Sequence, residues 1–337
     1  MASTFTRRDA FRLALAGGAG LAVAAPAVLR AQGSYPDRPV NVVIPFATGG
    51  YNDRLARAFA PFLQEALGQP LVMQNRPGAG TVLGNRFFLQ QPADGYTIMC
   101  TSAAPFIPLS ILVQNAPYQA EDFTMLNLPS RDLTLAATAA DKKIGSMEEV
   151  IERLKKDPTS LSIGVQPASA DLVNLALLMD ASGIDRSRMR IVTYDGGGPA
   201  RNATAGGHVD VGLVGGEGFL PIKEKIRPLL VFSDEKWEEF PDTTTVAEYG
   251  QKHGFKAEFV EGSQRGWVVQ TAFKNQQPER YKVMLAAVEK ASKDPKAIEA
   301  LKNQQLATRW YGPEASQKAY MDTFQAMKKH VALLKAS

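Results

Sequence analysis

Three loops rich in glycine and small polar residues carry the side chains best suited to hold a small anion. Each loop follows an apolar, strand-like run and precedes a helical pattern. Glycine lets a backbone approach a ligand closely, and a helix N-terminus offers unpaired N–H groups with partial positive charge. Such loops favour carboxylate or phosphate binding. The candidate binding residues are Thr48, Gly49, Gly50, Tyr51, Asn52 and Asp53 in the first loop, Ala168, Ser169 and Asp171 in the second, and Tyr194, Gly196, Gly197 and Gly198 in the third.

Two further segments are expected to reach the same region. Ser102 and Ala103 follow the apolar run 96–100, and Glu217 follows the run 209–214. In open α/β sheets the ligand crevice lies at the carboxyl ends of the strands, so these residues join the candidates. Each loop also has a purely structural interpretation, in which Asn52, Asp53 or Ser169 caps a helix and the glycines form a surface turn.

The sequence gives little support for catalysis, a metal or a nucleotide. Its three histidines, His208, His253 and His330, lack metal-ligand spacing. The patterns Gly-x-Ser-x-Gly, Gly-x-Gly-x-x-Gly and Gly-x-x-x-x-Gly-Lys-Ser/Thr are missing. The single cysteine, Cys100, excludes an internal disulfide and reads as a small core residue. We expect a protein that is not an enzyme and uses no cofactor and no metal.

The first 33 residues are predicted to be an export signal. Arg7 and Arg8 precede an apolar run over 13–29, and 31–33 offers small residues at a cleavage position. The paired arginines favour the twin-arginine route, with general secretion as the alternative. A membrane anchor is the other interpretation, but the run is shorter than the ~20 apolar residues of a span. Cleavage would remove four arginines and one aspartate and lower the formal charge from +4 to +1, so nothing favours nucleic acid and the mature protein is expected in the periplasm.

Strand-like and helical patterns alternate along the rest of the chain. A strand at 40–44 is followed by a helical pattern from Leu55 to Leu67, a second strand at 71–73, a second helix and a strand at 96–100. A similar alternation then runs from 133 to 232, and the remainder is predicted to be mostly helical. Repeated strand–helix units indicate parallel sheets covered by helices, here as two α/β lobes with a cleft between them.

Several motifs in order resemble the Bug family, the extracytoplasmic solute receptors of tripartite tricarboxylate transporters. The likeness covers most of the mature chain and is strongest in its first hundred residues. The motifs are Tyr35-Pro36-Asp37-Arg38-Pro39-Val40, Ile44-Pro45-Phe46-Ala47-Thr48-Gly49-Gly50, Asn75-Arg76-Pro77-Gly78-Ala79-Gly80, Asp94-Gly95-Tyr96-Thr97, the segment from Tyr194 to Pro199, and Gly207-His208-Val209-Asp210.

The resemblance implies a type II periplasmic-binding-protein fold. Its first lobe would be discontinuous, formed by 34–132 with 236–337, and its second lobe would be 133–235. It further implies a carboxylate ligand held by backbone amides and small hydroxyl groups, and permease subunits as partners. A monomer is expected.

The sequence departs from the family pattern at the loops. Tyr51-Asn52 replaces a pair that is often smaller, Asp171 lies in a shortened second loop, and Glu217 stands where Asp or neutral polar residues are common. Two added acids should disfavour a highly charged anion. We therefore predict a mono- or dicarboxylate with an apolar or aromatic body near Tyr51, rather than citrate. The alternatives are a receptor serving a sensor or another importer, and an exported enzyme on the same scaffold.

Overall fold

The computed structural model describes residues 35–166, 169–194 and 196–335, and from Pro36 onward the chain forms one compact unit. The predicted export signal at 1–33 lies outside the described residues, as does Ala168. Within the described part, no helix combines the length and apolarity needed to cross a bilayer.

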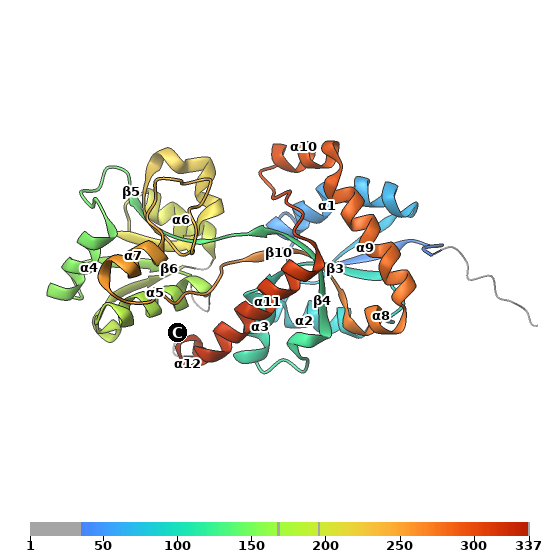
Figure 1. The fold of residues 1–337 in the computed structure, drawn as a ribbon, viewed down its shortest axis with the longest axis horizontal. Coiled ribbons are helices and arrows are strands. Elements are labelled where there is room, and N and C mark those ends of the chain that lie inside the picture. Colours follow the sequence, from blue (N-terminus) through green and yellow to red (C-terminus); the bar gives the residue numbers. More distant parts are fainter. Residues whose placement is uncertain (1–34, 167–168, 195, 336–337) are drawn as a thin grey trace, which may run out of the picture. The chain divides into compact units, whose positions relative to one another are not determined.

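The first sheet has the strand order β2-β1-β3-β10-β4. Its strands β3, β10 and β4 are labelled in Figure 1. β1 pairs in parallel with β2 and β3, whereas β10 runs antiparallel between β3 and β4. The strands are β1 (Val40–Ile44), β2 (Leu71–Asn75), β3 (Thr97–Ala104), β4 (Phe123–Arg131) and β10 (Gln264–Gln270). The helices of this part of the chain are α1 (Tyr51–Leu67), α2 (Val82–Leu89), α3 (Phe106–Leu112), α8 (Thr271–Gln276), α9 (Pro278–Lys293), α10 (Pro295–Asn303), α11 (Gly312–Lys329) and α12 (Val331–Lys335).

Helix α1 shows how the local sequence positions the first loop. Leu55, Phe59 and Leu63 recur at four-residue spacing and are fully or almost fully buried, as expected for the apolar face of an amphipathic helix. The helix ends at Gly68, which adopts a left-handed conformation with φ 67°. Its packing fixes the helix start, and therefore the glycine loop, at the carboxyl end of β1.

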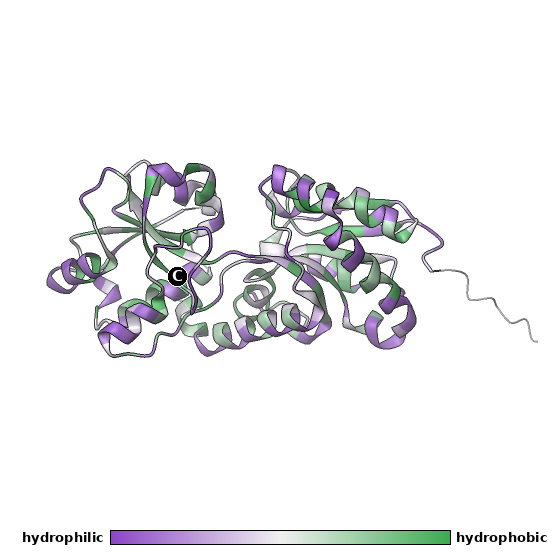
Figure 2. Ribbon diagram, turned by 45° about the horizontal axis from the view of Figure 1, so that its top comes forward, coloured by the Kyte–Doolittle hydropathy of each residue, from purple (hydrophilic) through white to green (hydrophobic). Residues whose placement is uncertain are grey.

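The second sheet has the order β7-β6-β8-β5-β9. β6 pairs in parallel with β7 and β8, and β5 runs antiparallel to β8 and β9. The strands are β5 (Thr134–Ala139), β6 (Ser162–Val165), β7 (Arg190–Thr193), β8 (Val211–Gly215) and β9 (Ile226–Val231), and the helices are α4 (Met147–Lys156), α5 (Ala170–Ala181), α6 (Gly197–Ala205) and α7 (Val246–His253). Hydrophilic residues gather on the outward-facing helices, while the strands are mainly apolar (Figure 2).

The second lobe, which was expected to end at residue 235, continues beyond it. Val246 and Tyr249 of α7 belong to the core of the second sheet, and Phe255 packs against it. The chain therefore returns to the first sheet nearer to β10 than predicted. The two segments that connect the sheets are joined by a hydrogen bond from the Asp132 N–H to the Ser263 carbonyl, at 2.8 Å.

Two strands were missed by the sequence interpretation. β4 was not predicted, and β10 lies in the region expected to be mostly helical. Pro129 in β4 and the polar pair Gln264 and Arg265 in β10 interrupt the apolar pattern that marks a strand. β10 is nevertheless an interior strand of the first sheet, because it pairs with β3 on one side and β4 on the other, and its Trp267 side chain is buried.

Candidate ligand-binding site

A cavity of about 390 Å³ collects the starts of three helices. The starts of α1, α5 and α6 contribute the lining residues Gly50, Tyr51, Asn52, Ser169, Asp171, Gly196 and Gly197, and Ser102 joins them from β3. The first-turn N–H groups of these helices lack intrahelical acceptors. Three helix starts with partial positive charge therefore line one cavity, which is an arrangement suited to an anion.

Asn52 and Ser102 form a buried polar pair in the lining of this cavity. The Asn52 side-chain Nδ2 donates to Ser102 Oγ at 2.9 Å, and Asn52 is only 3 % exposed. Its Oδ1 has no hydrogen-bond partner among the described residues. Both side chains are therefore held in place by their mutual hydrogen bond at the edge of the cavity.

Several predicted site residues support the loops instead of lining the cavity. Those absent from its lining are Thr48, Gly49, Asp53, Ala103, Tyr194 and Gly198. Asp53 accepts the Gly49 N–H at 2.8 Å and binds Arg57 and Asn75 through its other oxygen. Burial raises the pKa of Asp53, but these three hydrogen bonds outweigh it and lower the pKa overall. Asp53 therefore stabilises the loop, which is the structural alternative that its sequence position left open.

The surroundings of the other predicted site residues explain their positions. Thr48 is exposed, and Ala103 is completely buried in the core of the first sheet. Tyr194 packs against a small apolar cluster beside α6. Ser169 lines the cavity, but its hydroxyl also caps α5, donating to the Gln166 carbonyl and accepting from the Leu172 N–H.

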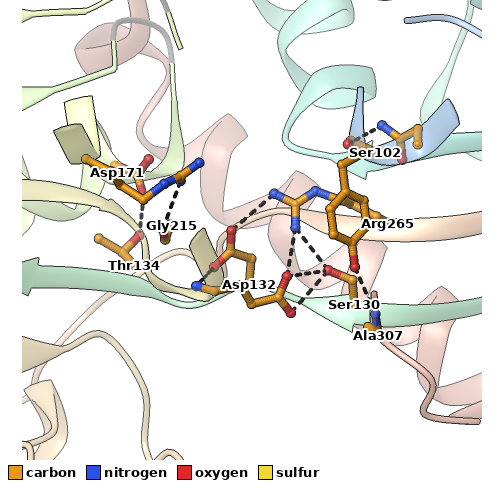
Figure 3. Close-up of polar contacts among 12 residues, drawn as sticks. Ser102, Ser130, Asp132, Thr134, Asp171, Gly215, Arg265 and Ala307 are labelled. Atoms are coloured by element: carbon orange, nitrogen blue, oxygen red, sulfur yellow. Dashed lines mark hydrogen bonds and ion pairs between the residues drawn. The ribbon is translucent and has the colours of Figure 1, made fainter. Parts of the chain in front are cut away.

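An ionic network around Arg265 forms a wall of the cavity (Figure 3). The Arg265 guanidinium lies 3.1 Å from a carboxylate oxygen of Asp132 and 3.1 Å from a carboxylate oxygen of Glu217. It also donates a hydrogen bond to the Ser130 hydroxyl. Although burial lowers the pKa of Arg265, the two carboxylates raise it overall. The guanidinium covers the ring of Tyr51, with 4.6 Å between Cζ and the ring centroid, and the Tyr51 hydroxyl accepts the Ala307 N–H. Sequence reasoning missed Arg265 because it lies in an unrecognised strand.

A second, larger cavity adjoins the first across this network. It has a volume of about 630 Å³ and shares Tyr51, Asp132, Arg201 and Arg265 with the smaller one. Glu217 lines only the larger cavity, so its predicted place beside the other loop residues needs correction. Its carboxylate accepts hydrogen bonds from Ser130 and Arg265. We call the smaller space the inner cavity and the larger one the outer cavity.

Asp171 is a buried acid on the wall of the inner cavity. Its Oδ1 accepts a 2.6 Å hydrogen bond from Thr134, whose hydroxyl in turn accepts from Asn174. Burial raises the pKa of Asp171 to about 7, and the nearby charge of Asp132 adds to the effect. The carboxyl group therefore changes charge near neutral pH.

Comparison with known proteins agrees with this architecture. Residues 55–336 match the family described as tripartite tricarboxylate transporter family receptor, also called TctC. The chain belongs to this family. The TctC receptors are solute-binding proteins, so the class of this protein is a receptor and not an enzyme, and the predicted Bug-family resemblance is confirmed.

Individual relatives support the same assignment. Protein BugT of Bordetella pertussis is 30 % identical over 227 residues, which are 64 % of this chain and 67 % of BugT. A TctC solute-binding protein from Polaromonas shares the fold with a TM-score of 0.71 at 22 % identity, covering 88 % of this chain and 99 % of that one. Rpa4515 of R. palustris, solved with adipate, has a TM-score of 0.66 at 22 % identity. The match covers 90 % of this chain and 98 % of Rpa4515. The two-lobed solute-binding fold of this TctC receptor is thereby confirmed.

Proposed function

We propose that this TctC receptor captures a small carboxylate in the inner cavity and delivers it to the permease of a tripartite tricarboxylate-type transporter. The ligand would be a mono-, di- or aromatic carboxylate. Export of the chain to the periplasm by its first 33 residues is part of the proposal. The observation that carries it is the meeting of three helix starts, from both sheets, at one cavity.

A ligand that contacts both lobes at once would favour the closed form of the receptor over the open form. A carboxylate accepts charge-assisted hydrogen bonds from helix-start N–H groups, each worth roughly 1.5–3 kcal/mol. The first lobe supplies the start of α1 with Ser102, and the second lobe supplies the starts of α5 and α6. A guest that touches both lobes stabilises the closed arrangement by its differential affinity. The permease would then recognise that closed form.

A ligand panel tests the proposed carboxylate class. Thermal unfolding is measured with succinate, malate, adipate, benzoate and citrate, together with mass spectrometry of any ligand that co-purifies. We expect one or more of the first four to raise the melting temperature, and citrate to have little effect. Stabilisation by tricarboxylates alone would contradict the proposed ligand class.

Replacing Gly50 with valine should abolish binding with little loss of folding. Gly50 has φ −69° and ψ 171°, which a β-branched residue adopts readily, and an added Cβ would meet only the Ala47 carbonyl oxygen, at 3.3 Å. The branched side chain would enter the inner cavity and obstruct approach to the α1 N–H groups. Calorimetric titration should show an affinity loss of roughly 100-fold or more, the equivalent of one or two charged hydrogen bonds.

Gly145→Val provides the matched control, because an added Cβ there meets only the end of the Glu149 side chain, at 3.7 Å, and Gly145 lines neither cavity. It should bind like the wild type. Equal affinity of the Gly50 variant and the wild type would remove the start of α1 from the site.

A further inference from the structure

Within the part of the chain that the structure describes, Arg201 on α6 uses little of its hydrogen-bonding capacity. One of its Nη atoms donates to the Gly215 carbonyl at 3.2 Å. Among the described residues, no carboxylate lies within ion-pair distance of it, whereas Arg265 has two. A guanidinium carries five N–H donors, so several remain for another acceptor.

Two glycines hold this guanidinium in place. A Cβ added at Gly218 would lie 2.1 Å from Arg201 Cζ, and one added at Gly197 would lie 2.7 Å from its Nη1. The side chain therefore passes directly over two α-carbons. At Gly197 and Gly218 the absence of a side chain makes room for an arginine, which is a reason for glycine that the loop sequence alone does not reveal.

Arg201 lies where the two cavities meet, since it lines both. Burial lowers the pKa of Arg201, and the charge of Asp132 offsets this only in part. A half-buried cation without a paired anion is costly to keep charged. An anion from solution would supply the missing charge and accept the free donors.

We propose that Arg201 binds the carboxylate of the ligand through a two-pronged ion pair at the junction of the cavities. Arg201 would then be the residue that makes this receptor select ionised carboxylates over neutral amides of the same shape. This inference rests on the proposed function and names the side chain responsible for it. Arg265 does not compete for the role, because Asp132 and Glu217 already neutralise it.

The test compares each carboxylate with its amide. Wild-type protein and Arg201→Met are titrated with benzoate against benzamide, and with succinate against succinamate. We expect the wild type to prefer the carboxylate by roughly 100-fold, as for a buried charge pair. The methionine variant should bind both members of each pair within a few fold. Its melting temperature without ligand should be unchanged or higher, because an unpaired buried charge has been removed.

Three further variants separate binding from structure. Arg201→Lys keeps the charge but loses the planar fork, so it should retain an intermediate preference. Gly218→Ala leaves Arg201 in the chain but displaces its guanidinium, so it should lose the preference as well. Arg190→Met removes an exposed arginine of β7 and should match the wild type.

The outcomes also distinguish this inference from the proposed function. Carboxylate binding that survives unchanged in Arg201→Met would overturn the role of Arg201 while leaving the receptor function intact. A wild-type protein that binds none of these carboxylates would overturn both. Weaker carboxylate binding together with a lower melting temperature in every Arg201 variant would show that Arg201 is structural, and would also overturn the inference.

Discussion

Replacing Arg265 with methionine should lower the free energy of unfolding by about 3–5 kcal/mol, the usual cost of leaving buried charges without their partner. Arg265 holds the carboxylates of Asp132 and Glu217 together, and its side chain is 15 % exposed. Without it, two acids of like charge would face each other in a largely enclosed space. Urea unfolding followed by circular dichroism measures the loss.

A combined variant checks the physical reason. Removing all three charges, with Arg265→Met, Asp132→Asn and Glu217→Gln in one chain, should recover most of the lost stability, since the two carboxylates are no longer left without a partner. Arg190→Met serves as the control for removing an exposed arginine and should change stability little. A combined variant as unstable as the single one would show that packing of the Arg265 side chain, including its contact with Tyr51, matters more than charge.

Asp171→Asn should stabilise the protein above neutral pH by an amount on the order of 4 kcal/mol. Asp171 has a pKa raised to about 7 in the folded protein, against an ordinary value of 3.8. The folded state therefore keeps a proton that the unfolded state has already lost. Stability falls as pH rises from near 4 to near 7, and the penalty is constant above that range. Asparagine carries no charge and is still able to accept the Thr134 hydrogen bond.

Unfolding free energies at several pH values from about 5 to about 8 test this sign. The difference between variant and wild type should grow with pH and then level off. Asp53→Asn should behave oppositely, because hydrogen bonds lower the pKa of Asp53 and its charge stabilises the loop. The charged groups near Asp171 are Asp132, Arg201 and Arg265. A difference between Asp171→Asn and wild type that does not change with pH would show that Asp171 titrates normally.

The charge of the site follows from these pairings. Glu217 and Asp132 are engaged by Arg265, so they add little repulsion toward a guest. Below about pH 7 Asp171 is neutral, which leaves Asp132, Arg265 and Arg201 as the charged lining of the inner cavity. Glu217 is ion-paired with Arg265, so the two arginines and the two carboxylates of this network balance. The expectation that the added acids disfavour a highly charged ligand stays a prediction.

Tyr51 has a structural contact in addition to its predicted contact with a ligand. Sequence reasoning placed an aromatic ligand body against its ring, but one face of that ring carries the Arg265 guanidinium. Aromatic and apolar surface for a ligand lies in both cavities, at Phe46, Phe106 and Val214 in the inner one and at Trp237, Leu220 and Pro221 in the outer one. Contact between an apolar ligand body and Tyr51 stays a prediction.

Local patterns in the sequence are enough to predict the α/β class, the first strands and the loops at the helix starts. These features depend on local patterns, such as the four-residue spacing of Leu55, Phe59 and Leu63 and the glycine that ends α1. The predicted starts of α1, α5 and α6 do meet at one cavity. Their role in ligand binding stays a prediction.

The pairing of charges in the site depends instead on how distant parts of the chain pack together. Arg265 is separated from Asp132 by 133 positions and from Glu217 by 48, and its own strand has no apolar pattern to reveal it. Arg201 likewise depends on Gly218, which belongs to a different element. Side-chain pairing across a cleft leaves no periodicity in the chain, because it depends on how distant elements pack. The fold class therefore follows from local pattern, whereas the electrostatics of the cavity follow from long-range contact.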